Sequence, residues 1–519
     1  MAPVEVEVAL GSYLFLFKKE KMSHTMKGDN MIRHSLWEEG RRKKEESSAL
    51  ERETDILIIG GGITGLTTAY FLKDCGKRVL LLDKGEVGGG VTAKTTAKIT
   101  YLQKTIYQEL KERFNKETAK QYYHSQKAAI KLLTNIVEKE KIACDLTETD
   151  SVIFCFEESN IEKIKKEEAL LREWEEEIEP IMHEQIKYGI KGKNTYTFHP
   201  LKYLDSLTKI VKKKVNIAEN VLVTQIKEED GYLVETSKGQ VKSMTIVVAC
   251  HYPFFLIPIM IPLKTYIKRE YVNAARVKEP KNYMAINIDS SLHSLRYYKD
   301  YLIYVSLDHK LTSRINYQKN YEESKKQFKK FFHETPEYTW MNQDIMSHDG
   351  LPFIGKIKEN LFLATAYNAW GMTNGTLAAK LISDEIRGHI SFYHQLFDPK
   401  RNNLTLMINS FVGSFAYLKV YAQALWKKNL PVYITQTGVR YGLYQDQDGT
   451  VHKIKLVCPH MKCSLVFNKE EKTWDCPCHG SRFDLDGNII EGPAKEDLSK
   501  TTYKKEEDDH NNCEEDQNE

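Results

Sequence analysis

The sequence of 519 residues predicts three structural parts: an α/β dinucleotide-binding domain with a Rossmann-like sheet, an inserted α+β domain built on an antiparallel sheet, and a C-terminal all-β domain. Three observations predict them. An unbroken apolar run from Ile56 to Ile59 is typical of a strand buried on both faces of a parallel sheet. Between residues 215 and 310 apolar and polar residues alternate, as they do in antiparallel strands. Four of the nine cysteines lie between Cys458 and Cys478, among short strands and turns.

Composition and charge exclude several classes of protein. Hydrophobic residues make up 41% and charged residues 28%, which is the balance of a globular chain. Lysine and arginine number 75 against 72 acidic residues, and a net charge of +3 gives no field for binding nucleic acid. Nine cysteines are too few for a secreted disulfide scaffold, and Glu5 and Glu7 precede the first apolar run, which reverses the order of a secretory signal. We therefore predict a cytoplasmic protein, and nothing in the sequence indicates a membrane association.

Changes in composition set the expected boundaries along the chain. Lys, Glu, Leu and Ala recur at helical spacing in residues 106–142 and 160–178, and we expect helices there. The expected parts are a polar leader or surface arm at 1–53, the dinucleotide-binding part at 54–390 with its insertion at about 140–345, a helical connector at 391–429, the all-β domain at 430–503, and an acidic disordered tail at 504–519.

A glycine motif follows the first buried strand. Gly60, Gly62 and Gly65 form a Gly-x-Gly-x-x-Gly pattern at the start of an amphipathic helix, and Asp83 ends the next apolar strand. Such glycines permit a tight turn, a close approach of backbone to a pyrophosphate, and a helix lying close on its strand. The helix N-terminus attracts the phosphates, and the acid accepts hydrogen bonds from ribose hydroxyls. Together these features predict dinucleotide binding rather than a structural turn.

A cluster of cysteine and histidine near the C-terminus predicts a metal centre. Cys458 and His460 form one pair, Cys476 and His479 form the other, and 15 residues separate the pairs. Two thiolates and two imidazoles suit a Rieske [2Fe–2S] centre, in which the thiolates hold one iron and the imidazoles the other. A zinc ribbon that uses four of the Cys and His side chains in this segment is the alternative.

Taken together, these motifs resemble the D-amino-acid oxidase and sarcosine oxidase superfamily of FAD enzymes, most closely its members that end in a Rieske domain. The resemblance covers residues 34–503. It implies FAD as the dinucleotide, iron ligation by the two Cys–His pairs, and a disulfide between Cys463 and Cys478. It also implies flavin contacts by the Thr-Thr-Ala-Lys segment, namely Thr95, Thr96 and Lys98. Relatives carry Gly-His before this segment, whereas this chain has Ala-Lys at 93–94.

Two later stretches also match that superfamily. Residues 245–253 look like the strand that returns to the FAD domain. Residues 349–355 look like the final flavin-contacting loop, and the helix after it begins with Gly371 and Met372, which we expect to contact the cofactor. No second Gly-x-Gly-x-x-Gly motif joins a strand to a helix, which favours a small organic electron donor over NAD(P)H. We expect Arg269, Tyr271, His348 and Trp370 as candidates for the donor pocket, and we assign no catalytic residue.

The Rieske segment departs from the high-potential pattern at one position. Rieske centres of high potential receive hydrogen bonds from a Ser and a Tyr hydroxyl, and here Ser481 matches the first, whereas Phe483 replaces the Tyr. Fewer donors stabilise the reduced cluster less, so we predict a lower reduction potential than in respiratory Rieske centres. Lys462 also stands where a glycine is usual before the second cysteine.

A two-electron flavin site and a one-electron cluster on one chain predict a redox relay. We expect a dehydrogenase that takes electrons from a small amine or amino-acid-like donor and passes them through the cluster to an external acceptor, either a protein or a quinone. Two alternatives stay open at this point: a non-catalytic electron-transfer or redox-sensing protein, and a membrane-associated quinone reductase.

Overall fold

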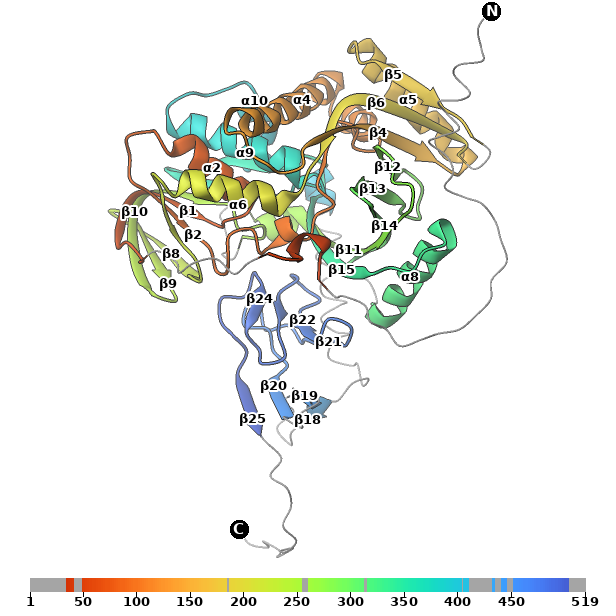
Figure 1. Ribbon diagram of the computed structural model, residues 1–519. Coiled ribbons are helices and arrows are strands. Elements are labelled where there is room, and N and C mark those ends of the chain that lie inside the picture. Colours follow the sequence, from red (N-terminus) through yellow and green to blue (C-terminus); the bar gives the residue numbers. More distant parts are fainter. Residues whose placement is uncertain are drawn as a thin grey trace, which may run out of the picture. The chain divides into compact units, whose positions relative to one another are not determined.

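A computed structural model divides the chain into two compact units, Met1–Tyr417 and Leu418–Glu519 (Figure 1). Most of the expected leader, residues 410–429 of the expected connector, and the expected acidic tail at 504–519 lie outside the described residues. The structure describes residues 34–41, 49–183, 186–253, 260–311, 315–403, 405–409, 432–434, 440–445 and 451–503. None of the helices described in these ranges is long and apolar enough to cross a membrane.

The first sheet has eight strands and a parallel centre, which confirms the α/β prediction. Strand β1 pairs in parallel with β2 on one side and with β10 on the other. Ile56 and Ile58 join the core on one face, and Leu57 and Ile59 join the core on the other, because successive strand residues alternate. The strands are β1 (Glu53–Ile59), β2 (Val79–Leu82), β7 (Asn216–Ala218), β8 (Val223–Glu229), β9 (Gly231–Thr236), β10 (Gly239–Val248), β16 (Phe353–Lys358) and β17 (Leu361–Thr365).

Helices cover the face of this sheet that carries the glycine turn (Figure 1). Helix α2 packs against α9 and α6, and α4 packs against α9. Local signals start several of them: Asn115 caps α4 by accepting the N–H of Thr118, and Pro200 occupies the first turn of α6. The α-helices of this unit whose bounds lie within the described residues are α2 (Ile63–Leu72), α3 (Ile106–Arg113), α4 (Lys116–Lys139), α5 (Ile161–Glu173), α6 (Pro200–Val211), α7 (Ile261–Lys264), α8 (Tyr317–Phe332), α9 (Gly371–Ile386) and α10 (Tyr393–Phe397).

The second sheet has nine mostly antiparallel strands and confirms the inserted domain. The chain enters it twice, because residues 216–248 return to the first sheet between the two visits. Helix α8 packs on β11 and β14. The strands are β3 (Lys98–Ile99), β4 (Thr147–Cys155), β5 (Ile178–Ile181), β6 (Tyr188–Thr197), β11 (Thr265–Arg276), β12 (Tyr283–Asn287), β13 (Ser294–Tyr298), β14 (Tyr301–Lys310) and β15 (Tyr338–Ser347).

One part of the expected surface arm belongs instead to the core. Residues 34–41 contain a short 3-10 helix, η1 (Leu36–Glu38), and its Trp37 is only 1% exposed. Arg41 binds the carbonyl oxygen of Val87 at 2.7 Å and the carboxylate of Asp205 at 2.8 Å. The polar composition of the first 53 residues concealed two large apolar side chains, Leu36 and Trp37, whose burial anchors this segment.

The second unit confirms the all-β prediction. In its described residues two four-stranded sheets form it, and the paired strands are antiparallel. The strands are β18 (Val432–Ile434), β19 (Arg440–Gln445), β20 (Val451–Lys455), β25 (Lys500–Tyr503), β21 (Val466–Asn468), β22 (Thr473–Asp475), β23 (Arg482–Phe483) and β24 (Ile489–Glu491).

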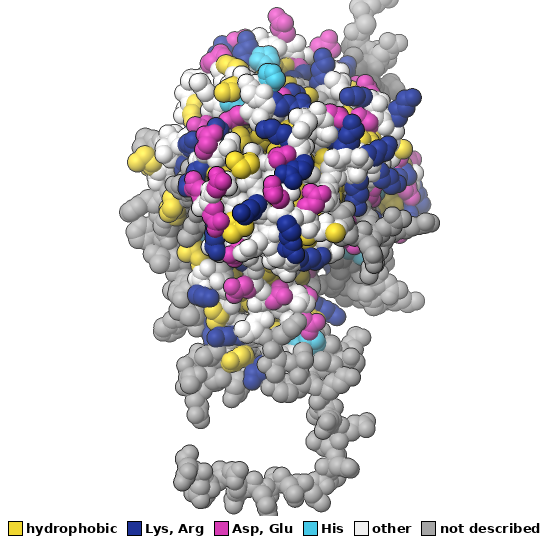
Figure 2. Space-filling view, turned by 90° about the vertical axis from the view of Figure 1, so that its left-hand side faces the viewer, with side chains coloured by type: hydrophobic (Ala, Val, Ile, Leu, Met, Phe, Trp, Pro, Cys, Tyr) yellow, Lys and Arg dark blue, Asp and Glu magenta, His cyan; other side chains and the backbone are white. Residues whose placement is uncertain are grey.

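The surface charge agrees with the balanced composition. On the face of the molecule seen in Figure 2, lysine, arginine and acidic side chains are interspersed.

Candidate functional site

The glycine turn between β1 and α2 fits a dinucleotide. Gly60 has a φ of +108°, and a Cβ there would lie 2.6 Å from the carbonyl oxygen of Ala249. A Cβ on Gly65 would lie 1.8 Å from the carbonyl oxygen of Gly60, so the helix touches the turn. Gly62 is the N-cap of α2 and carries no side chain over the first turn. The turn therefore leaves the helix N-terminus open to a phosphate, as the motif predicts.

Asp83 lies at the end of β2, beside this turn. Its carboxylate accepts the N–H of Gly61 at 2.6 Å and the N–H of Gly85 at 2.8 Å. Burial raises the pKa of Asp83, and these two N–H groups act in the opposite direction. A carboxylate that already faces the turn is placed to accept ribose hydroxyls, so the residues present fit an adenine dinucleotide.

A cavity in the same unit collects residues from distant parts of the chain. Its wall includes the Thr-Thr-Ala-Lys segment, strands of the second sheet, and the start of α9. Five of the nine predicted cofactor residues meet there, and the other four surround the glycine turn. The lining residues are Thr95, Thr96, Lys98, Glu270, Ile286, Leu292, Ser294, Val305, Ala369, Trp370, Gly371 and Met372.

Lys98 is the buried cation of this cavity wall. Its Nζ donates to the carbonyl oxygen of Ala285 at 2.8 Å and to the Oγ of Ser294 at 2.7 Å. Burial, and to a smaller extent the charge of Arg296, lower the pKa of Lys98 to about 7, while Glu270 opposes the shift.

The two predicted pocket residues on strand β11 face away from the cavity, whereas the residue between them faces it. Glu270 faces the cavity, whereas Arg269 and Tyr271 face α8 on the other side of the sheet, because the side chains of a strand alternate. Arg269 donates to Gln343 at 2.9 Å and to Tyr317 at 2.6 Å. These two residues do not line the cavity.

Of the two other predicted pocket residues, one lines the cavity and one does not. Trp370 lines the cavity, but His348 stacks on Tyr266 with ring centroids 5.3 Å apart and is not part of the wall. Sequence analysis missed Glu270, although its position one residue from Arg269 in an alternating strand was the available signal.

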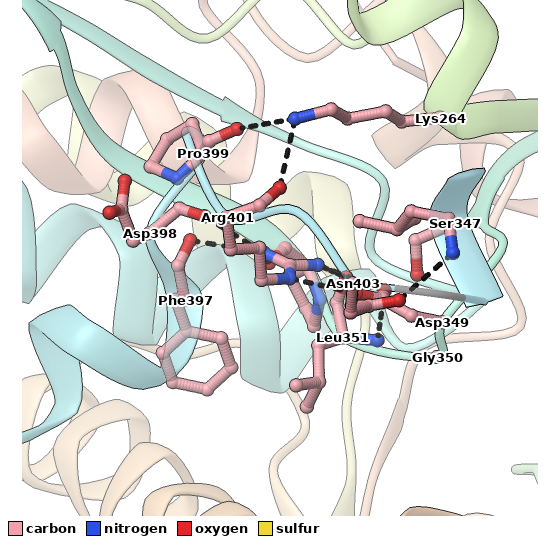
Figure 3. A network of polar contacts seen from close by, with 12 residues as sticks. Lys264, Ser347, Asp349, Gly350, Leu351, Phe397, Asp398, Pro399, Arg401 and Asn403 are labelled. Atoms are coloured by element: carbon pink, nitrogen blue, oxygen red, sulfur yellow. Dashed lines mark hydrogen bonds and ion pairs between the residues drawn. The ribbon is translucent and has the colours of Figure 1, made fainter. Parts of the chain in front are cut away.

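The loop that joins β15 to β16 is fixed by a buried ion pair (Figure 3). Asp349 is 0% exposed, and Arg401 binds both of its oxygens, Nε to Oδ2 at 2.9 Å and Nη2 to Oδ1 at 3.0 Å. Asn403 donates to Asp349 at 3.0 Å, and Arg401 also donates to the carbonyl oxygen of Pro352 at 2.8 Å. Burial alone would raise the pKa of Asp349, but the charge of Arg401 and the hydrogen bonds from Arg401, Asn403 and the N–H of Leu351 together outweigh it and hold that pKa below its usual range.

In the second unit, two loops bring the predicted metal ligands together in pairs. Cys458 and Cys476 are 0% and 1% exposed, and their thiols share a hydrogen bond. The rings of His460 and His479 lie perpendicular, with centroids 4.9 Å apart. Nδ1 of His460 is buried and has no hydrogen-bond partner among the described residues. Paired sulfurs beside paired imidazoles, with a buried imidazole nitrogen left over, fit a Rieske cluster.

A disulfide joins Cys463 to Cys478 and so links the two loops. The sulfurs of Cys463, Cys476 and Cys478 also lie within 4.8 Å of one another, but a bonded pair leaves only one thiolate in that group. A zinc ribbon that needs these cysteines as ligands is therefore disfavoured.

The hydrogen bonds expected around the cluster are partly present. The hydroxyl of Ser481 forms a hydrogen bond with Cys458 and accepts the N–H of Ala494 at 3.0 Å. Phe483 is fully buried on β23 and offers no donor. Lys462 adopts a φ of +57°, the left-handed conformation that explains why a glycine is usual at this position.

Comparison with known families identifies both units. Residues 55–385, more than half of the chain, match the profile of the FAD dependent oxidoreductase family. The chain belongs to that family. Residues 416–502 match the Rieske [2Fe-2S] domain. The enzyme accordingly binds FAD in the first unit and a [2Fe–2S] cluster in the second.

Individual relatives agree with this assignment. The iron-sulfur protein YhfW of Bacillus subtilis, a Rieske protein by name, is 33% identical over 86% of this chain and 92% of its own. Gamma-glutamylputrescine oxidoreductase of Escherichia coli is 21% identical over 64% of this chain and 84% of its own. The structure of glycine oxidase from Geobacillus kaustophilus superposes with a TM-score of 0.59 at 14% identity, covering 68% of this chain and all of that one. The last comparison shows the shared fold.

Proposed function

We propose that this FAD-dependent oxidoreductase is a dehydrogenase of a small organic amine, whose electrons leave one at a time through the Rieske cluster to an external acceptor. Oxidation of the C–H bond beside an amine nitrogen removes two electrons and two protons and yields an imine. Bound FAD supplies a two-electron acceptor, and the cluster supplies a one-electron carrier. The observation that carries the proposal is a cavity formed by the expected cofactor segment and the second sheet, on one chain with a Rieske domain.

One carboxylate of the cavity wall is a binding point for an amine. Glu270 is the acidic side chain among the lining residues, is 14% exposed and lies 3.4 Å from Lys268, whereas Lys98 is the basic one. Ile286, Leu292 and Val305 supply apolar surface opposite it. A protonated amine is attracted to such a half-buried carboxylate, while its carbon chain packs on the apolar wall. The names of the relatives, which act on gamma-glutamylputrescine and glycine, agree with a nitrogen-bearing donor.

The assignment of cofactor residues belongs to the same proposal. The N-terminus of α2 with Gly60, Gly62 and Gly65 receives the diphosphate, and Asp83 receives the ribose hydroxyls. The ring system would lie along the part of the cavity wall formed by the segment at 95–98 and the start of α9, with the donor on the part formed by the second sheet. Cys458, His460, Cys476 and His479 are the cluster ligands.

Anaerobic reduction tests the proposal directly. The holoenzyme is mixed without oxygen with a set of primary and secondary amines, with and without an α-carboxylate, and the flavin absorbance is followed. At least one amine is expected to bleach the flavin. Glu270→Gln should raise the amine concentration for half-maximal bleaching about tenfold or more, the effect of losing one charge-assisted hydrogen bond. Glu235→Gln, which removes an exposed partner of Lys227, is the matched control and should change nothing.

Other results would support the alternatives. Reduction by a protein partner but by no amine would identify an electron carrier. Recovery of the native protein in the membrane pellet, together with quinone reduction, would identify a membrane-associated quinone reductase. The cytoplasmic location expected from the sequence is part of the present proposal, and cell fractionation tests it.

A further inference from the structure

The Thr-Thr-Ala-Lys segment is held from behind by three side chains that come from distant parts of the chain. Trp37 lies on η1, Arg296 lies on β13, and Trp340 lies on β15. All three are buried, with 1%, 1% and 3% of their surface exposed. Their hydrogen bonds to the segment run from Trp340 to the carbonyl oxygen of Lys94 (2.9 Å), from Trp37 to that of Thr95 (2.7 Å), and from Arg296 to those of Thr96 (2.9 Å) and Ala97 (2.8 Å).

Four successive carbonyl oxygens thus accept hydrogen bonds from side chains behind the segment. In a planar trans peptide the N–H of the next residue points opposite to the carbonyl. The N–H groups of Thr95 and Thr96 therefore point away from the three donors, and both residues line the cavity. Among the described residues no hydrogen bond uses either N–H group, whereas the N–H of Ala97 is taken by the hydroxyl of Thr95 at 3.0 Å.

Arg296 is the charged residue among the three donors to the segment. Burial lowers the pKa of Arg296 to about 9, and the guanidinium also donates to the carbonyl oxygen of Phe198 at 3.1 Å and lies 5.2 Å from the centre of the Trp37 ring. Carbonyl oxygens and an aromatic face stabilise this cation, and no carboxylate forms an ion pair with it within the described ranges. A buried charge that depends on these carbonyl oxygens keeps the peptide planes of the segment in one orientation.

We propose that Trp37, Arg296 and Trp340 are positioning residues that fix the carbonyl oxygens at 94–97 and so present the N–H groups of Thr95 and Thr96 to the isoalloxazine ring of FAD. This inference rests on the proposed place of the ring in the cavity. Two N–H donors held in place stabilise the negative charge that a flavin gains on reduction. Because the donors are already oriented, no free energy is spent on reorienting them when the charge appears. The segment that holds Trp37 therefore acts on the redox centre although it precedes the first strand of the fold.

Removing one donor while keeping its ring tests this inference. Trp37→Phe and Trp340→Phe each delete an indole N–H, and purified holoenzymes are compared for flavin reduction potential, visible flavin spectrum and rate of FAD release on dilution. Trp174→Phe is the matched control, because Trp174 is buried in the same core and its Nε1 has no hydrogen-bond partner among the described residues. We expect a more negative flavin potential and a release rate about three- to tenfold higher in the first two variants, the effect of one hydrogen bond, and no change in the control.

Arg296→Lys separates charge from geometry. A lysine keeps the positive charge, but its shorter side chain does not bring Nζ to the position of Nη1, the nitrogen through which Arg296 binds both carbonyl oxygens, so the same shift in potential and spectrum is expected. If potential, spectrum and release of the three variants stay as in the wild type, whatever their thermal stability, the inference is wrong. These readouts need no amine, so they remain decisive even if no amine reduces the enzyme.

Discussion

Replacing Arg401 by methionine should destabilise the first unit far more than replacing an exposed arginine. Arg401→Met keeps much of the aliphatic volume but leaves the carboxylate of Asp349, which is 0% exposed, without its counter-charge. It also removes the donor to the carbonyl oxygens of Leu351 and Pro352. Breaking a buried pair by deleting one partner costs about 3–5 kcal/mol, and we expect the free energy of unfolding to fall by that amount.

The assay is denaturant unfolding of the holoenzyme, followed by the flavin fluorescence that appears on release. Arg78→Met is the matched control, because Arg78 pairs with Glu53 at 3.1 Å but its side chain is 56% exposed, and such exposed pairs contribute little to stability. In the double variant Arg401→Met/Asp349→Asn the loss should be smaller than the sum of the two single losses, because no buried charge is left alone. Equal costs for Arg401→Met and Arg78→Met would refute the reasoning.

The same pair gives a pH dependence of known sign. The pKa of Asp349 is depressed in the folded protein, so its contribution to stability is present above the pKa of an unfolded aspartate and is lost as the pH falls through the lower folded value. Wild-type stability should therefore include a component that disappears below about pH 4. Asp349→Asn should lack that component when unfolding is measured across the acid range.

Three further predictions concern the two cofactor sites. Phe483→Tyr adds a hydroxyl at a fully buried position of the cluster domain and should raise the cluster reduction potential, measured by protein-film voltammetry; an unchanged potential would contradict the role given to the missing donor. Gly65→Ala places a Cβ 1.8 Å from the carbonyl oxygen of Gly60 and should abolish FAD retention, whereas Gly90→Ala, where nothing lies within 4 Å of the added atom, should keep a full complement of flavin. His460→Ala should remove the Rieske signal in electron paramagnetic resonance and leave the flavin absorbance in place; a retained signal would show that another residue is the ligand.

The site residues that sequence analysis could propose are those whose chemistry is local. The glycine turn and the Cys–His pairs work through neighbours a few residues away, so spacing alone located them. Arg296 and Trp340 bind residues more than 100 positions away in the sequence, and Glu270 faces a cavity that the segment at 95–98 also lines, so a periodic pattern along the strand does not reveal these partners. Arg269 shows the limit most clearly, because one step along β11 sends its side chain to the opposite side of the sheet.

The segment containing Trp37 was misjudged for a related reason. Two apolar side chains in a strongly charged stretch carry no periodic pattern, and their burial depends on a surface built by β13 and β15. When composition is averaged over residues 1–53, the charged residues dominate, and the segment is predicted to be a surface arm. The expectation of helices at 106–142 and 160–178 succeeded because a long amphipathic pattern is visible without any knowledge of its partner.

The strand order of the first sheet has a consequence for synthesis. Strand β1 lies between β2 and β10, and β10 in turn pairs with β17, which ends at Thr365. During translation the glycine turn therefore emerges long before β10 and β17, the strands that extend the sheet beyond β1. The sheet is complete only after most of the first unit has left the ribosome. The two cluster loops and the disulfide between them lie within a few dozen residues. We expect the iron–sulfur domain to fold quickly after its synthesis. The flavin domain cannot complete its sheet until its last strands are synthesised, and until then it exposes an apolar sheet edge to which chaperones can bind.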